Sequence, residues 1–181
     1  GTVNVVDTTA PVITVLGNDP ETVEVGSTYT DAGATADGGE TVTTSGTVDT
    51  NTVGVYTITY TATDSSNNVA TATRTVDVVD TTVPVITLVG NNPVDVEAAT
   101  TYTDAGATAQ DNYDGDITSS ITTTNNIDMN TVGTYSVIYN VADANGNSAV
   151  PLIRTVNVVD TTAPVITILG SNPVNIQVGS V

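Results

Sequence analysis

The chain repeats itself, and this repetition constrains its fold more than any other feature. VVDTTAPVITVLG at 5–17 returns as VVDTTVPVITLVG at 78–90 and as VVDTTAPVITILG at 158–170, at offsets of 73 and then 80 residues. A segment that recurs at similar intervals marks a structural unit that is used again. Units of this length lie near the lower size at which a domain can bury a core of its own.

Further matches between these three copies set the boundaries of the units. TYTDAGATA occurs at 28–36 and 101–109, and NTVGVYTITY at 51–60 matches NTVGTYSVIY at 130–139. The chain is therefore expected to divide into four parts. These are the last strand of a preceding repeat (1–6), a first whole repeat (7–80), a second (81–160) and the beginning of a third, incomplete repeat (161–181).

Within each repeat, short segments with period-two alternation are separated by Gly, Asn, Asp and Pro. In YTITYTATD, apolar side chains fall on one face and threonines on the other, because successive side chains of a strand point to opposite faces. The inner face is expected to carry Tyr56, Ile58, Tyr60 and Ala62 in the first unit, and Tyr135, Val137, Tyr139 and Val141 in the second. No stretch shows sustained helical spacing. The pattern predicts an all-β chain of two sandwiches with about seven strands each.

Composition excludes several classes of function. The chain contains two arginines and 20 acidic residues, with no lysine and no histidine, and its net charge is −18. Such a chain has no basic surface for nucleic acid or for an anionic membrane. No apolar run approaches the 18 or so residues that a membrane-spanning helix needs, so no membrane insertion is expected within this segment.

The side chains of most hydrolytic sites are missing too. The absence of Cys and His excludes disulfides, thiol nucleophiles, Ser-His-Asp triads and ordinary zinc sites. A carboxylate pair for glycoside hydrolysis remains formally available. However, no Trp or Phe is present to support a sugar ring, and the aspartates lie in turn-type segments. We expect no enzymatic activity and no catalytic residues.

Several motifs together resemble one family. They are the linker DTTAPVIT, VEVGSTYTDAGATA, DNYDGDIT, the G-V/T-Y segments at 54–56 and 133–135, the turn DANGN and the last segment RTVNVVD. Across nearly the whole chain they resemble the bacterial Ig-like tandem repeats of large cell-surface and adhesin proteins. The resemblance implies a linear array of immunoglobulin-like β-sandwiches outside the cell. It also implies that Tyr56 and Tyr135 are corner tyrosines whose phenols bond back to the chain.

Aspartates are concentrated where the first whole unit meets the second. In the Ig-like order, the loop between strands B and C and the turn between strands F and G lie at the pole that faces the preceding unit. The expected cluster consists of the linker residue Asp80, the loop residues Asp111, Asp114 and Asp116, and the turn residues Asp143 and Asn145. Converging carboxylates repel one another unless a cation lies among them. Calcium fits this set of oxygen ligands better than magnesium, which prefers to keep its waters.

A plainer interpretation remains open, because Asp, Asn and Gly also dominate turns without any metal. It applies most strongly to the turn at 143–147. The first unit reads TADGGETV where the second reads TAQDNYDGDITSSI, so its own pole has fewer candidate ligands, namely Asp7, Asp37 and Asp64. Asp31 and Asp104, in the TYTDAG segments, are expected to have a strand-end or bulge role.

The sequence thus favours a mechanical function. The units are expected to be extender modules in the stalk of an extracellular adhesin or surface filament, with calcium stiffening the junctions and neighbouring repeats as partners. Two alternatives belong to other classes. In one, copies of the chain associate by strand addition through the incomplete terminal repeats. In the other, the units bind a glycan.

Overall fold

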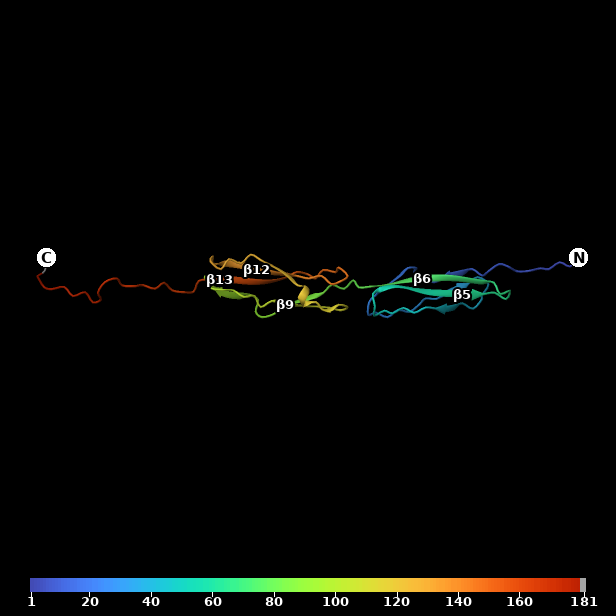
Figure 1. Ribbon diagram of the computed structural model, residues 1–181, viewed down its shortest axis with the longest axis horizontal. Helices are drawn as coiled ribbons and strands as arrows, with labels where there is room; N and C mark the ends of the chain where they lie inside the picture. The colour runs from blue at the N-terminus through green and yellow to red at the C-terminus, as the bar shows by residue number, and fades with distance from the viewer. Residues whose placement is uncertain (180–181) are drawn as a thin grey trace.

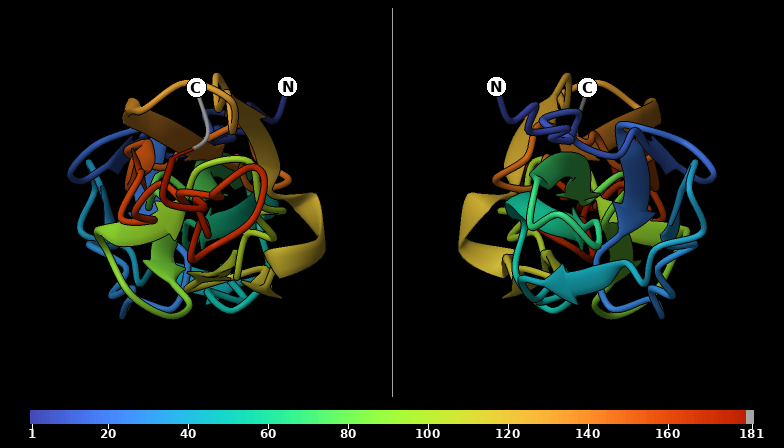
Figure 2. Two further views of the ribbon diagram at one scale, coloured as in Figure 1. Left: turned by 90° about the vertical axis from the view of Figure 1, so that its left-hand side faces the viewer. Right: turned by 90° about the vertical axis from the view of Figure 1, so that its right-hand side faces the viewer.

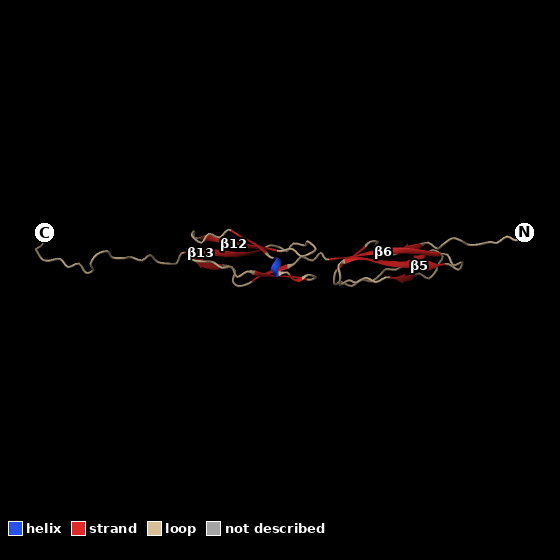
Figure 3. Ribbon diagram, viewed as in Figure 1, coloured by secondary structure: helices blue, strands red, loops and turns tan. Residues whose placement is uncertain are grey.

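The computed structural model describes residues 1–179, and it shows two elongated units joined end to end (Figure 1). The two ends of the chain point away from each other along the same axis. In both end-on views the units overlap, so they share one long axis (Figure 2). Nearly all regular structure is β-strand, with a single short 3₁₀ turn (Figure 3). The all-β prediction is confirmed.

The first unit contains two sheets of unequal size. A small sheet pairs β1 with β3, and a larger one has the order β2-β6-β5-β4. The strands are β1 (Ile13–Val15), β2 (Glu21–Glu24), β3 (Ala34–Ala36), β4 (Thr43–Ser45), β5 (Gly54–Thr63) and β6 (Val69–Val79). The long β5–β6 hairpin is antiparallel, whereas β2 runs parallel to β6.

The second unit repeats this plan and adds one short hairpin. Its sheets have the orders β10-β9-β7 and β11-β12-β13-β8, and β8 runs parallel to β13. The elements are β7 (Val85–Leu88), β8 (Val94–Glu97), β9 (Ala107–Asp111), β10 (Gly115–Asp116), η1 (Thr118–Ser120), β11 (Thr122–Asn125), β12 (Gly133–Asn140) and β13 (Leu152–Val159). The additional strand, β10, comes from the DNYDGD segment that the first unit lacks.

The two ends of the chain form no strand among the described residues. Residues 1–12 and 160–179 have no regular structure beyond bends at 170 and 172–173 and a turn at 178–179. The assignment of residues 1–6 and 161–181 to neighbouring repeats stays a prediction, and residues 180 and 181 lie outside the described residues. No helix within residues 1–179 is long and apolar enough to cross a membrane.

The expected period-two faces form the cores. Ile58, Tyr60 and Ala62 are at most 4% exposed, and so are Val137 and Tyr139 in the second unit. The corner tyrosines are confirmed as well, since Tyr56 Oη donates to Thr52 O at 2.9 Å and Tyr135 Oη to Thr131 O at 2.8 Å.

Each core also buries one of the two arginines of the chain, and both arginines are 1% exposed. Arg74 Nη1 lies 2.8 Å from Asp31 Oδ1, and Arg154 Nη1 lies 3.3 Å from Asp104 Oδ1. In each unit two tyrosines donate to the same aspartate: Tyr29 and Tyr60 to Asp31, and Tyr102 and Tyr139 to Asp104. Every full positive charge on a side chain is thus placed inside a sandwich.

Asp31 and Asp104 therefore do more than the strand-end role expected of them. That role is present, because Gly33 N donates to Asp31 Oδ2 and Gly106 N to Asp104 Oδ2. No local sequence pattern predicts the ion pairs, because their partners lie 43 residues apart in the first unit. Burial would raise the pKa of Asp104, but hydrogen bonds from Tyr139, Tyr102 and Gly106 and the charge of Arg154 outweigh it and lower the pKa.

Replacing Asp104 with Asn should lower the free energy of unfolding of the second unit by about 3 kcal/mol, since it leaves a buried guanidinium without its counter-ion. The folded-state pKa of Asp104 lies below its ordinary value of 3.8, so the stabilisation is complete above that pH and is lost as the pH falls through the folded-state pKa. Chemical unfolding at several pH values measures both effects. The exposed Asp95→Asn serves as the control, and equal losses for the two variants would contradict the assignment.

Candidate metal centre at the junction between the units

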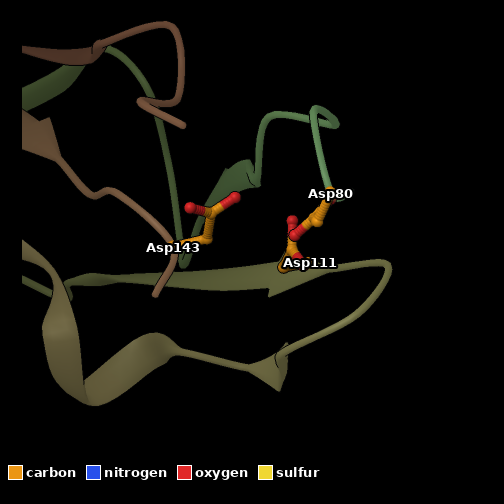
Figure 4. Close-up of side chains that lie close together, drawn as sticks. All are labelled: Asp80, Asp111 and Asp143. Atoms are coloured by element: carbon orange, nitrogen blue, oxygen red, sulfur yellow. The ribbon is translucent and has the colours of Figure 1, made fainter. Parts of the chain in front are cut away.

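Three separate segments bring a carboxylate each to the junction. Asp80 follows directly after β6 and begins the linker, Asp111 ends β9, and Asp143 opens the turn between β12 and β13. Figure 4 shows the three side chains approaching one another from these segments. One oxygen from each lies within 4.8 Å of the others. The exposed fractions are 6% for Asp80, 9% for Asp111 and 8% for Asp143.

The carboxylate of Asp143 is held by its own turn. Asn147 donates from its main-chain N to Oδ1 and from Nδ2 to Oδ2, both at 2.7 Å. Burial would raise the pKa of Asp143, but these hydrogen bonds from Asn147, together with those from Gly146 N and Asn145 N, outweigh it and lower the pKa. Asp143 is therefore held in its charged form.

Asp80 and Asp111 are held at fewer points. Asp80 accepts from Thr82 N at 3.2 Å and from Asn145 Nδ2 at 3.1 Å. Asp111 Oδ1 accepts from Tyr113 N at 2.8 Å and from Asp114 N at 2.9 Å. The other oxygen of Asp111, Oδ2, is buried and has no hydrogen-bond partner.

This unpartnered oxygen indicates what the cluster is able to do. A buried polar atom without a partner costs about 1–3 kcal/mol, and more when it carries charge. Two unit charges 4 Å apart add a repulsion of about 1 kcal/mol even in water. A metal ion placed among the three carboxylates would remove both costs. The arrangement is therefore able to bind a metal ion.

The other predicted ligands of the second unit lie beside this cluster. Asp114 Oδ2 accepts from Ala144 N at 2.6 Å, in the turn that carries Asp143. Asp116 is exposed and accepts from Thr118 N at 2.9 Å, and its pKa is lowered by hydrogen bonds from the side chain and main chain of Thr118. Asn145 contacts the cluster through Asp80. Metal ligation by Asp114, Asp116 and Asn145 stays a prediction.

The pole of the first unit is built differently. Asp37 Oδ1 accepts from Val12 N at 2.8 Å, whereas Asp64 accepts from Ser66 N and from Asn68 within its own turn. Asp7 contacts that turn through Ser66 Oγ at 3.4 Å. Among residues 1–179, no group of three acidic side chains that could share an ion includes Asp7, Asp37 or Asp64.

The junction also contains two clamps that the sequence did not reveal. In the first clamp, the second unit binds the linker that precedes it, because Asn147 Nδ2 donates to Asp80 O at 3.0 Å. The pole of the first unit repeats this contact, with Asn68 Nδ2 donating to Asp7 O at 3.2 Å.

In the second clamp, the first unit binds the linker that follows it. Glu24, at the end of β2, accepts from Thr81 N at 2.9 Å, from Thr81 Oγ1 at 2.8 Å and from Thr82 Oγ1 at 2.9 Å. The same three contacts join Glu97 to Thr161 and Thr162 after the second unit. Hydrogen bonds from Thr81 lower the pKa of Glu24, so it remains charged.

The two clamps overlap along the chain. The second unit binds residue 80, whereas the first unit binds residues 81 and 82. No residue without such a contact lies between the two clamps. The only available signal was that DTT recurs in all three copies and Glu occupies the same place in both repeats. The clamps span 57 and 67 residues, and sequence alone does not pair such distant positions.

Comparison with known proteins identifies the type of unit. A family model described as "Bacterial surface protein, Ig-like domain" matches residues 13–78 and again residues 86–158. These two matches confirm the resemblance and the tandem Ig-like β-sandwich fold expected from the sequence. No curated protein matches the chain.

Among solved structures, the chain is similar to the lipoprotein BT2262 from Bacteroides thetaiotaomicron. The two are 28% identical, with a TM-score of 0.39, over 45% of this chain and 40% of the lipoprotein. The chain therefore spans less than half of the length of that protein.

Replacing Asp111 with Asn should have opposite effects with and without metal. The substitution keeps Oδ1 for the turn and puts an amide donor between two carboxylates. In a chelating buffer it should therefore raise the free energy of unfolding by about 1 kcal/mol, the size of one relieved repulsion. In excess divalent cation the substitution should lower the free energy of unfolding, because it removes a ligand of the ion. Thermal unfolding in the two buffers provides the measurement, and the same sign in both would mean that Asp111 serves only its turn.

Proposed function

The chain belongs to the bacterial surface protein Ig-like domain family, and we propose that its two units are extender modules in the stalk of a long extracellular adhesin or surface filament. The overlap of the two clamps on the linker is the observation that carries this proposal. Where no residue is free to rotate between two domains, each domain restricts the motion of the next. Such a chain holds whatever lies at its end at a fixed distance.

Calcium is the cation that we propose for the junction. It takes six to eight oxygen ligands in flexible geometry, which suits carboxylates from three separate segments. Magnesium requires a tight octahedron and releases its waters reluctantly. Asp80 comes from the linker, whereas Asp111 and Asp143 belong to the second unit, so a shared ion ties the linker to the unit that follows. Extracellular calcium modules bind with Kd on the order of 10⁻⁴ to 10⁻³ M, and we expect this range here.

The charge of the chain agrees with a surface location. A net charge of −18 makes neighbouring copies repel one another and keeps a dense array in solution. It also attracts divalent cations. The partners that we propose for each unit are therefore the adjacent repeats of its own chain, with calcium between them.

A second function is favoured by the exposed segment after the second unit. Residues 165–178 have almost the sequence of β7 and β8, yet Val165, Ile166 and Leu169 are at least 90% exposed. Strands with free edges and apolar side chains add to the sheets of other molecules. The segment is thus able to join a second copy of the chain. The glycan-binding alternative stays a prediction.

Calcium should lengthen and straighten the chain. Small-angle scattering at rising calcium should show a larger maximum dimension, and the thermal midpoint of unfolding should rise with it. At 100 times Kd the ion stabilises the chain by about 2.7 kcal/mol. Asp111→Asn should abolish both responses, whereas the matched change Asp37→Asn, at the pole without the cluster, should leave them intact. Equal loss in the two variants would refute the proposed position of the ion.

Self-association has its own test. If the exposed ends drive assembly, the 181-residue chain should form dimers or larger species in sedimentation, whereas a chain trimmed to residues 7–160 should remain monomeric. Two monomeric chains would exclude assembly through the ends and leave the extender function.

A further inference from the structure

The hairpin of β9 and β10 reaches across the junction to the first unit. Its tip carries Tyr113, whose Oη accepts a hydrogen bond from Val53 N at 3.3 Å. Val53 directly precedes β5 in the first unit. Around this contact lies a cavity of about 510 Å³, lined by Val25, Gly26 and Asn51 of the first unit and by Asn112 and Tyr113 of the second. The two units therefore meet away from the linker as well as through it.

The tip of this hairpin is fixed by the same side chain that faces the carboxylate cluster. Asp111 Oδ1 accepts from Tyr113 N and Asp114 N, its Oδ2 is buried without a partner, and its carboxylate is one of the three that form the cluster. Asp114 in turn accepts from Ala144 N, next to Asp143. Any shift of the Asp111 carboxylate thus moves the turn that presents Tyr113.

We infer that the hairpin is a brace between the two units, and that a cation bound by Asp80, Asp111 and Asp143 locks Tyr113 onto the first unit. This inference rests on the proposed function. The clamps on residues 80–82 hold the units along their common axis, but contacts on one line resist bending poorly. A second contact on another segment, at the hairpin tip, limits both bending and twisting. The ion holds Asp111 in place and so preserves the turn that carries the brace.

The brace also distinguishes two kinds of unit. The first unit lacks the DNYDGD segment and has no tyrosine between β3 and β4. Its pole has the Asn68 clamp on Asp7, but it has no hairpin tip, and Asp7, Asp37 and Asp64 do not form a cluster that could share an ion. A unit of the second type forms a braced joint with the unit before it, whereas a unit of the first type relies on its clamp alone. The order of the two types along an array would set where it bends.

Distances between spin labels on the two units test the brace. The chain has no cysteine, so Thr44→Cys in β4 and Thr124→Cys in β11, both exposed, give one label on each unit. In the full chain, calcium should narrow the distribution of distances to a single peak. With Tyr113→Phe, which removes the acceptor, or Tyr113→Ala, which removes the ring as well, the distribution should stay broad in calcium. Tyr135→Phe removes a similar phenol contact within the second unit, and it should behave like the unchanged chain.

Calcium affinity gives the reciprocal measurement. If the ion favours the docked hairpin, docking must favour the ion by the same factor, and coupling between two sites typically begins at about 5-fold. Titration calorimetry should therefore show about 5-fold weaker calcium binding by Tyr113→Ala. If that variant matches the unchanged chain in both affinity and distance distribution, the brace is refuted and the calcium site stands. If the unchanged chain does not respond to calcium, the calcium site proposed for the junction is overturned and the calcium-controlled brace with it, whereas the clamps on the linker are unaffected.

Discussion

Asp80 is the residue on which the junction depends. Its main-chain carbonyl is held by Asn147 of the second unit, and its carboxylate meets Asp111 and Asp143. The next residue, Thr81, is already held by Glu24 of the first unit. One peptide bond therefore separates the grip of one unit from that of the next. Without this overlap the two sandwiches would be connected by an extended strand that bends freely.

The interiors of the units are stabilised independently of the junction. Each sandwich is small and has no disulfide, and each buries an arginine beneath two tyrosines and one aspartate. Breaking such a pair is costly, although apolar residues would pack the same space at least as well. A single ionic network in the same place in both units favours one arrangement of the two sheets. Because the units themselves are rigid, the stiffness of the whole chain depends on the stiffness of the junction.

The sequence predicted features whose signals are local or repeated. The sequence repeats predicted two units, and the alternation of apolar and polar residues predicted the buried faces of β5 and β12. The position of Tyr56 at the start of β5 predicted that its phenol bonds back to the main chain. The approach of Asp80, Asp111 and Asp143 followed from the strand order of the family. The strand order could not show which of several closely spaced aspartates faces the cluster. Asp111, Asp114 and Asp116 belong to one hairpin, but the direction of each carboxylate depends on which amide it caps. The Glu24 clamp and the Arg74–Asp31 pair join positions 57 and 43 residues apart, where no local pattern operates.

The most direct measurement is a high-resolution crystal structure of the chain grown in calcium. We expect a calcium ion bonded to Asp80, Asp111 and Asp143, with ligand distances of about 2.3–2.6 Å and with Asp111 Oδ2 among the ligands. A map in which Asp80 turns to solvent and Asp111 Oδ2 contacts only water, with calcium in excess, would contradict it.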